Sequence, residues 1–168
     1  TNHATLAGHT LAHELQMCAD AGMLGSVDAN RGNPQNGWDT DQFPSDLYDT
    51  VQSMLVILND GGFKTGGLNF DAKLRRESTN LEDMFIAHIG GMDSYARGLL
   101  IAHEILENSS LMDSLQHRYE SFNDGQGQAF EKSQLSLVDL RNYAAENGEP
   151  IQQSGRQEWV ENVMNDFI

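Results

Sequence analysis

The sequence predicts an incomplete α/β fold followed by a tail of helices. Two short apolar runs, residues 23–27 and 66–70, each end at an aspartate and are typical of buried strands. Helical patterns separate and follow them, and this alternation favours parallel strands joined by right-handed crossovers. Beyond Asn108 no further strand pattern occurs. The fold is therefore expected to change from α/β to all-helical at about that residue.

The elements of the first part follow from residue periodicity and from residues that end helices. Residues 1–9 read as a loop, and apolar residues recur at helical spacing over residues 10–22. A loop rich in asparagine, glycine and proline follows the first strand. Residues 44–46 then begin a second helix, which Gly61 and Gly62 end.

Only helices are predicted after the second strand. Thr79 and Glu82 are spaced as in a capping box, which opens a long helix reaching about Glu107. The adjacent Gly90 and Gly91 predict close packing or a bend within it. Four short helices are expected next, at about residues 110–120, 126–132, 137–146 and 156–167.

Apolar side chains in the tail, residues 108–168, are too widely spread to form one core among themselves. Such spacing is typical of an arm that packs on another subunit. It is equally typical of a small helical subdomain, and the residues alone leave both interpretations open.

The predicted strands are too few for a complete fold. Two strands cannot make a stable parallel sheet with both faces covered, and an eight-stranded β/α barrel needs about 250 residues. The chain has 168 residues and begins at Thr1, without an initiator methionine. We therefore expect it to be the last part of a larger polypeptide, cut inside the protein.

Composition disfavours several classes of partner. The formal net charge is −15, from 25 acidic and 10 basic residues, and such a surface repels phosphate backbones. Nucleic acid and anionic membranes are therefore not expected as partners. No apolar run approaches the roughly 20 residues of a membrane helix, and no signal-peptide core is present. The single cysteine, Cys18, excludes an internal disulfide and fits a reducing cytoplasm, where we expect the protein to be.

Carboxylates and one imidazole mark a candidate metal site. Asp28 and Asp71 follow the two predicted strands, at the edge where α/β folds bind ligands. His3 is expected just past the end of a preceding strand. Asp39 and Asp41, two residues apart in an extended loop, would point the same way. Such donors favour Mg²⁺, Mn²⁺ or Co²⁺, whereas the competing interpretation is that each aspartate forms a turn or caps a helix.

A second group of histidines is interpreted as structural. His9 and His13 are four residues apart and Glu14 follows, but this is not the H-E-x-x-H order of zinc proteases. His13 and Glu14 are therefore read as helix surface or packing. His88 and His103 lie within the long helix and are read in the same way.

Several stretches distributed along the chain match one known family. They are residues 2–9 (NHATLAGH), 25–32 (GSVDANRG), 37–44 (GWDTDQFP), 62–63 (GF), 66–73 (GGLNFDAK), 87–89 (AHI), 92–93 (MD) and 153–158 (QSGRQE). In this order and with these gaps the sequence resembles xylose isomerase, in its longer-chain class. The resemblance covers essentially the whole chain, as a C-terminal portion of that enzyme.

The resemblance implies a fold and an assembly. Residues 1–107 would be the last strands and helices of a (β/α)8 TIM barrel and would carry the metal-ligand loops. Residues 108–168 would be an extended helical arm that wraps a neighbouring subunit and holds a homotetramer together. This favours the arm over the subdomain for the tail.

The resemblance also implies an activity and its ligands. The family interconverts D-xylose and D-xylulose, and usually D-glucose and D-fructose, by a hydride shift that two divalent cations assist. Asp28 and Asp71 would bind the first cation, and His3, Asp39 and Asp41 the second. The family's catalytic lysine, its other metal-binding glutamates and its ring-opening His/Asp pair would all lie upstream. No catalytic residue is therefore expected in this chain, which should be inactive alone.

Two other interpretations compete with this one. The first is a non-catalytic module, derived from the same barrel, that binds divalent metal or serves assembly. The second is another divalent-metal barrel enzyme, such as a phosphodiesterase. The charge of −15 and the lack of a phosphate-binding pattern count against the second.

Overall fold

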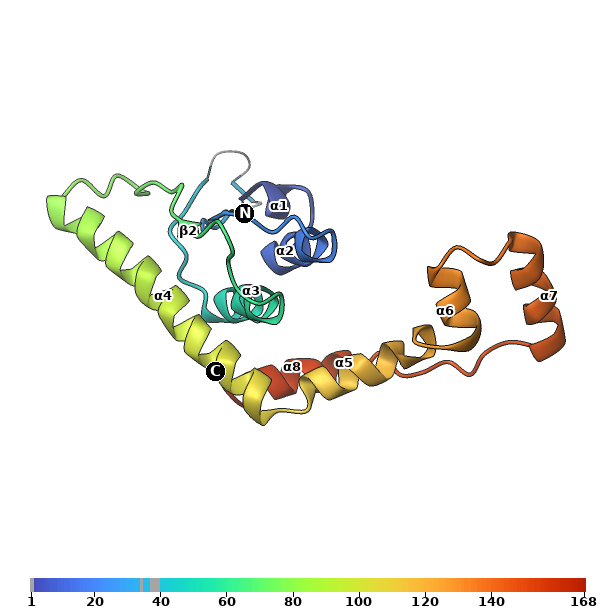
Figure 1. Cartoon of the computed structure of the whole chain (residues 1–168). Helices are drawn as coiled ribbons and strands as arrows, with labels where there is room; N and C mark the ends of the chain where they lie inside the picture. The colour runs from blue at the N-terminus through green and yellow to red at the C-terminus, as the bar shows by residue number, and fades with distance from the viewer. Residues whose placement is uncertain (1, 34, 37–39) are drawn as a thin grey trace. The chain divides into compact units, whose positions relative to one another are not determined.

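The computed structural model of the chain describes residues 2–33, 35–36 and 40–168 (Figure 1). Its residues divide into two compact units. The first comprises the chain up to Glu107 together with Phe167 and Ile168, and the second comprises Asn108–Asp166. Most of the described chain is helical, and its one sheet has two strands.

The first unit alternates helices with two very short strands. In chain order its elements are α1 (Asn2–Leu6), α2 (Leu11–Asp20), β1 (Val27–Asp28), α3 (Leu47–Asn59), β2 (Leu68–Asn69) and α4 (Leu81–Asn108), whose last residue falls in the second unit.

The two strands pair in parallel, as the alternation of helices and strands predicts. Val27 lies opposite Leu68, and Asp28 lies opposite Asn69. Both strands are shorter than expected, and the prediction of a buried strand from Met23 onward was wrong. Met23 is 75% exposed, and the regular pairing begins only at Val27. An apolar run without the alternation of a half-buried strand does not by itself reveal where pairing starts.

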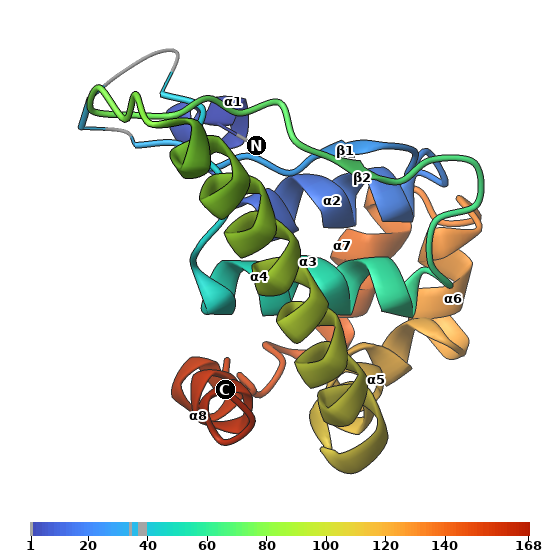
Figure 2. The same cartoon turned by 90° about the vertical axis from the view of Figure 1, so that its left-hand side faces the viewer.

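The core of the first unit lies between α2, α3, α4 and β1. In both views α2 and α3 lie side by side, and α4 packs against α3 (Figure 2). Ile57 is 1% exposed, and burying a side chain of this size stabilises the fold by about 1.5–3 kcal/mol. The buried cluster consists of Leu15, Val27, Ala29, Met54, Ile57, Tyr95 and Ala102.

The start of the chain is helical, so the prediction of a loop over residues 1–9 was wrong. Asn2–Leu6 form α1, in which Asn2 and Ala4 are buried. A five-residue helix is not stable alone. Ordering its first turn costs more free energy than the few hydrogen bonds of such a short helix contribute. Tertiary contacts hold it instead, among them the hydrogen bond from the Asn2 backbone N–H to the Asn30 side-chain oxygen at 2.9 Å.

Side chains cap the helices of the first unit close to where the sequence predicts. The Asp46 carboxylate accepts from the backbone N–H groups of Tyr48 and Asp49 and begins α3. The predicted cap of α4 is displaced by one residue. There the Asn80 N–H donates to the Asp83 carboxylate at 3.2 Å, so the Asn80/Asp83 pair occupies the position expected for Thr79 and Glu82.

Glycines allow α4 to pack closely on its neighbours. The helix runs unbroken over 28 residues, so Gly90 and Gly91 mark no break in it. A Cβ at Gly91 would lie 2.9 Å from the Phe70 ring, and one at Gly98 would lie 2.9 Å from the Thr50 hydroxyl oxygen. Even with this helix included, none of the described helices has the length and apolar character that crossing a membrane requires.

The second unit contains only helices, as predicted. They are α5 (Leu111–Tyr119), the 3₁₀ turn η1 (Glu120–Phe122), α6 (Gly125–Glu131), α7 (Leu137–Asn147) and α8 (Gln157–Asn165). Ser136 and Asp139 form the capping box of α7. Within Asn108–Asp166, all of which the structure describes, Met164 is the only buried residue, whereas Leu137 is 85% exposed. Its apolar side chains therefore do not form a core of their own.

Adding a methyl group at two glycines of α4 should have opposite effects. Gly98→Ala should lower the free energy of unfolding by about 1–3 kcal/mol, because its Cβ would meet the buried Thr50. Gly90→Ala is the matched control. It should raise stability by about 0.5–1 kcal/mol, because no atom lies within 4 Å of its Cβ and alanine favours a helix. Urea unfolding measures both, and a stabilised Gly98→Ala variant would contradict the packing of α4 on α3.

Candidate metal-binding site

Two of the predicted ligands lie at one end of the parallel sheet. Asp28 is the second residue of β1, and Asp71 follows β2 by two residues. Because the strands are parallel and in register, both carboxylates belong to the carboxyl end of the sheet, where α/β folds bind ligands. Both residues are exposed, and the Asn69 amide donates to the Asp28 carboxylate.

The buried side chain of Asn30 links three segments that carry predicted ligands. Its amide oxygen accepts from the Asn2 N–H at 2.9 Å, next to His3. Its amide nitrogen donates to the Asp71 carbonyl at 2.7 Å and to the Asp41 carboxylate at 3.3 Å. Asn30 is 7% exposed, so these bonds form in a site largely closed to water. Sequence reasoning did not single out Asn30, whose only signal was its place two residues after Asp28.

Backbone pairing holds the loop that carries Asp41. Arg31 and Gln42 form an antiparallel bridge, in which each backbone N–H donates to the other's carbonyl, at 2.8 and 2.9 Å. The Lys73 N–H donates to the Asp41 carbonyl at 3.1 Å. This loop is therefore closed at its base and attached to the segment that follows β2.

Among the described residues, Asn30 links segments that carry predicted ligands, but these ligands do not close a site. His3 lies on α1 and is exposed, whereas Asp39 lies outside the described residues. Among the residues that the structure describes, no three of His3, Asp28, Asp41 and Asp71 bring their ligand atoms within 4.8 Å of one another. The donors are of the kind that divalent cations such as Mg²⁺ accept, and they need further ligands to complete a coordination shell.

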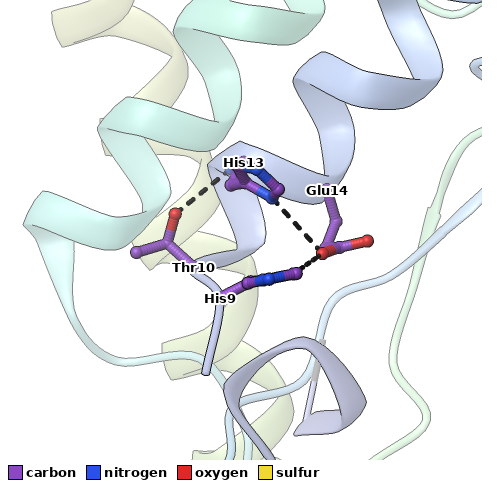
Figure 3. A network of polar contacts seen from close by, with 4 residues as sticks. All are labelled: His9, Thr10, His13 and Glu14. Atoms are coloured by element: carbon purple, nitrogen blue, oxygen red, sulfur yellow. Dashed lines mark hydrogen bonds and ion pairs between the residues drawn. The ribbon is translucent and has the colours of Figure 1, made fainter. Parts of the chain in front are cut away.

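A different group of donors does converge. His9 precedes α2, whereas His13 and Glu14 lie in its first turn, and the three side chains face one another (Figure 3). One Glu14 carboxylate oxygen faces Nδ1 of His9 and, at 3.3 Å, Nδ1 of His13. These hydrogen bonds, with that of His9 contributing most, lower the pKa of the Glu14 carboxyl group.

This group was only half predicted. His13 and Glu14 lie on the helix surface as expected, but their meeting with His9 was not foreseen. The only sequence signal for this group was the spacing of four residues between His9 and His13. The sequence did not show that Thr10 caps α2 by accepting from the His13 N–H at 3.1 Å, with His9 beside the first turn.

Comparison with known proteins gives a consistent result. Residues 115–168 match the family model described as the XylA2 C-terminal domain. Xylose isomerase 2 of Xanthomonas campestris pv. campestris (strain 8004) is 59% identical over 167 residues, which are 99% of this chain and 37% of that relative. Xylose isomerase of Xanthomonas oryzae pv. oryzae (strain MAFF 311018) is 58% identical, and xylose isomerase 1 of Xanthomonas axonopodis pv. citri (strain 306) is also 58% identical.

These similarities relate the chain to the xylose isomerases. Nearly all of it is similar to proteins of that name, and its last third matches a family model described as a C-terminal domain. The chain spans 37–38% of the length of the curated relatives it matches.

Removing the Asn30 amide should weaken the whole candidate site. Asn30→Ala should lower the free energy of unfolding by about 2–3 kcal/mol, because it removes the partners of one buried and two partly buried groups in three segments. Asn36→Ala, an exposed position of the same loop, should change it by less than about 0.5 kcal/mol. Urea titrations of both variants check this, and equal stability of the two would argue against a linking role for Asn30.

Proposed function

We propose that the chain is the C-terminal part of a xylose isomerase, an intramolecular oxidoreductase. The complete enzyme would interconvert D-xylose and D-xylulose, and also D-glucose and D-fructose, by a hydride shift between C1 and C2 of the open-chain sugar. The observation that carries this proposal is identity of 58–59% over 99% of the chain to proteins named xylose isomerase. The positions of Asp28 and Asp71 at the carboxyl end of the paired strands support it.

The proposed cofactors are two divalent cations, Mg²⁺ or else Mn²⁺ or Co²⁺. Asp28 and Asp71 would hold one cation, and His3, Asp39 and Asp41 the other. Bound there, the cations would polarise the sugar's oxygen atoms as Lewis acids. Two observations support these assignments. The side chains are donors that such cations bind, and the Asn30 amide links the Asp71 backbone to the Asp41 carboxylate. The remaining ligands and the catalytic side chains would come from the rest of the enzyme.

The two-stranded sheet is proposed to be a section of a (β/α)8 barrel. A parallel pair of two-residue strands is not stable alone, because parallel sheets require cover on both faces and further strands. In the described chain β2 remains at an edge, and its Leu68 and Asn69 are both exposed. Residues 1–107 would thus supply the last units of the barrel, with β1 and β2 pairing onward to strands of the remaining polypeptide.

The second unit is proposed to be an arm that holds a homotetramer together. Large apolar side chains of this unit are exposed, as a surface that packs on another subunit would be. They are Leu115, Tyr119, Phe122, Phe130, Leu137, Val138, Tyr143 and Ile151. We further propose that the enzyme is cytoplasmic, in keeping with its single exposed cysteine, Cys18.

Neutralising either carboxylate at the sheet end should abolish most activity of the complete enzyme. Asp28→Asn and Asp71→Asn should each lower kcat/KM for D-xylose by about 100-fold or more, with partial recovery at high Mg²⁺, because each removes a proposed charged ligand. Asp20→Asn, on the exposed surface of α2, should leave kcat/KM unchanged. Xylulose formation measured over a range of Mg²⁺ concentrations checks this. Full activity of either ligand variant would refute the assignment.

The polypeptide of residues 1–168 should form no xylulose when supplied alone. Its donors do not close a metal site among the described residues, and the proposed catalytic groups lie elsewhere. The complete polypeptide, assayed in parallel with Mg²⁺, is the positive control. Turnover by the isolated chain at a rate near that of the control would overturn the assignment of catalysis to other residues. Metal binding without turnover by the complete polypeptide would favour a non-catalytic assembly module.

A further inference from the structure

The proposed isomerase reaction assigns no role to the three converging side chains of His9, His13 and Glu14. Each offers one ligand atom, and these atoms all lie within 4.8 Å of one another. Among the residues that the structure describes, this is the one group of three or more histidine, cysteine or acidic side chains with that property. The two imidazole rings lie with centroids 4.5 Å apart and tilted by 51°.

The spacing of one pair of these donors suits a tetrahedral metal ion. Zinc binds imidazole nitrogen and carboxylate oxygen at about 2.0–2.1 Å, which places neighbouring ligand atoms about 3.3 Å apart in a tetrahedron. The distance from Nδ1 of His13 to the Glu14 carboxylate oxygen is 3.3 Å. Nδ1 of His9 faces the same oxygen more closely (Figure 3), so the His9 and Glu14 side chains would rotate apart to admit an ion between the three atoms.

The backbone positions these donors on both sides of the group. The His9 N–H donates to the Ala4 carbonyl at 2.9 Å, which attaches His9 to the end of α1. Thr10 caps α2 through its hydrogen bond with the His13 N–H, which fixes the helical turn that carries His13 and Glu14. The side chains are 48%, 51% and 43% exposed, respectively, so an ion has access to them from solvent.

We propose that His9, His13 and Glu14 form a third metal site, which binds Zn²⁺ or a closely similar transition-metal ion. Two imidazoles with one carboxylate favour zinc and its neighbours over Mg²⁺, whose preferred ligands are oxygens. Three protein ligands leave a fourth position for water. Because His9 is attached to α1 and the other two ligands belong to α2, the ion would tie the two helices together. This proposal does not rest on the isomerase activity.

Cobalt titration of the complete polypeptide tests the site directly. With Mg²⁺ present in saturating amount, Co²⁺ should add one equivalent with the visible absorption of four-coordinate cobalt, and Zn²⁺ should displace it. His9→Gln and His13→Gln should each weaken this binding by at least about tenfold, because each removes a ligand. His117→Gln is the matched control, since His117 faces a single carboxylate, that of Glu120, at 3.0 Å and should leave binding unchanged.

Further variants separate this site from the proposed catalytic metals. Asp28→Asn and Asp71→Asn should keep the cobalt absorption, whether or not the polypeptide isomerises xylose. Circular dichroism of the histidine variants should be unchanged, because both side chains are about half exposed. Cobalt binding weaker than about 1 mM, or equal binding by the His9→Gln/His13→Gln double variant, would overturn the proposal. The group would then be a hydrogen-bonded cluster only.

Discussion

The hydrogen bonds of the Asn30 side chain are the constraint on which the arrangement of the candidate ligands depends. One amide accepts from the start of α1 and donates to the segments at Asp41 and Asp71. An asparagine suits this position because its side chain offers an acceptor and two donors at once. A buried amide with all its bonds made also specifies one arrangement, because any other would leave polar groups unpaired.

The packing around this amide explains why so little sheet is enough to position it. β1 and β2 together span only four residues, but Val27 and Ala29, on either side of Asp28, are buried in the core with α2, α3 and α4. The side chains of Val27 and Ala29 therefore hold the carboxyl end of β1 against the core. Because Gly91 and Gly98 have no side chain, α4 can approach Phe70 and Thr50 closely.

The chain carries two donor groups with different chemistry. The carboxylates near Asn30 are hard donors, no three of which converge in the described chain, so the proposed ion would need ligands from other residues. The group of His9, His13 and Glu14 has softer donors that already converge, and it lies on consecutive local elements. A site of the first kind requires the whole fold, whereas one of the second kind requires only a capped helix and the residue before it.

From the sequence alone, the helices other than α1, the parallel direction of the strands and the start of α3 near Asp46 could be predicted. These follow from periodicity and from hydrogen bonds within a few residues. Only the tertiary structure decided that α1 is helical, where strand pairing begins and that Asn30 links its segments. These features depend on contacts across 28 and 41 residues, whose geometry arises only when distant elements pack.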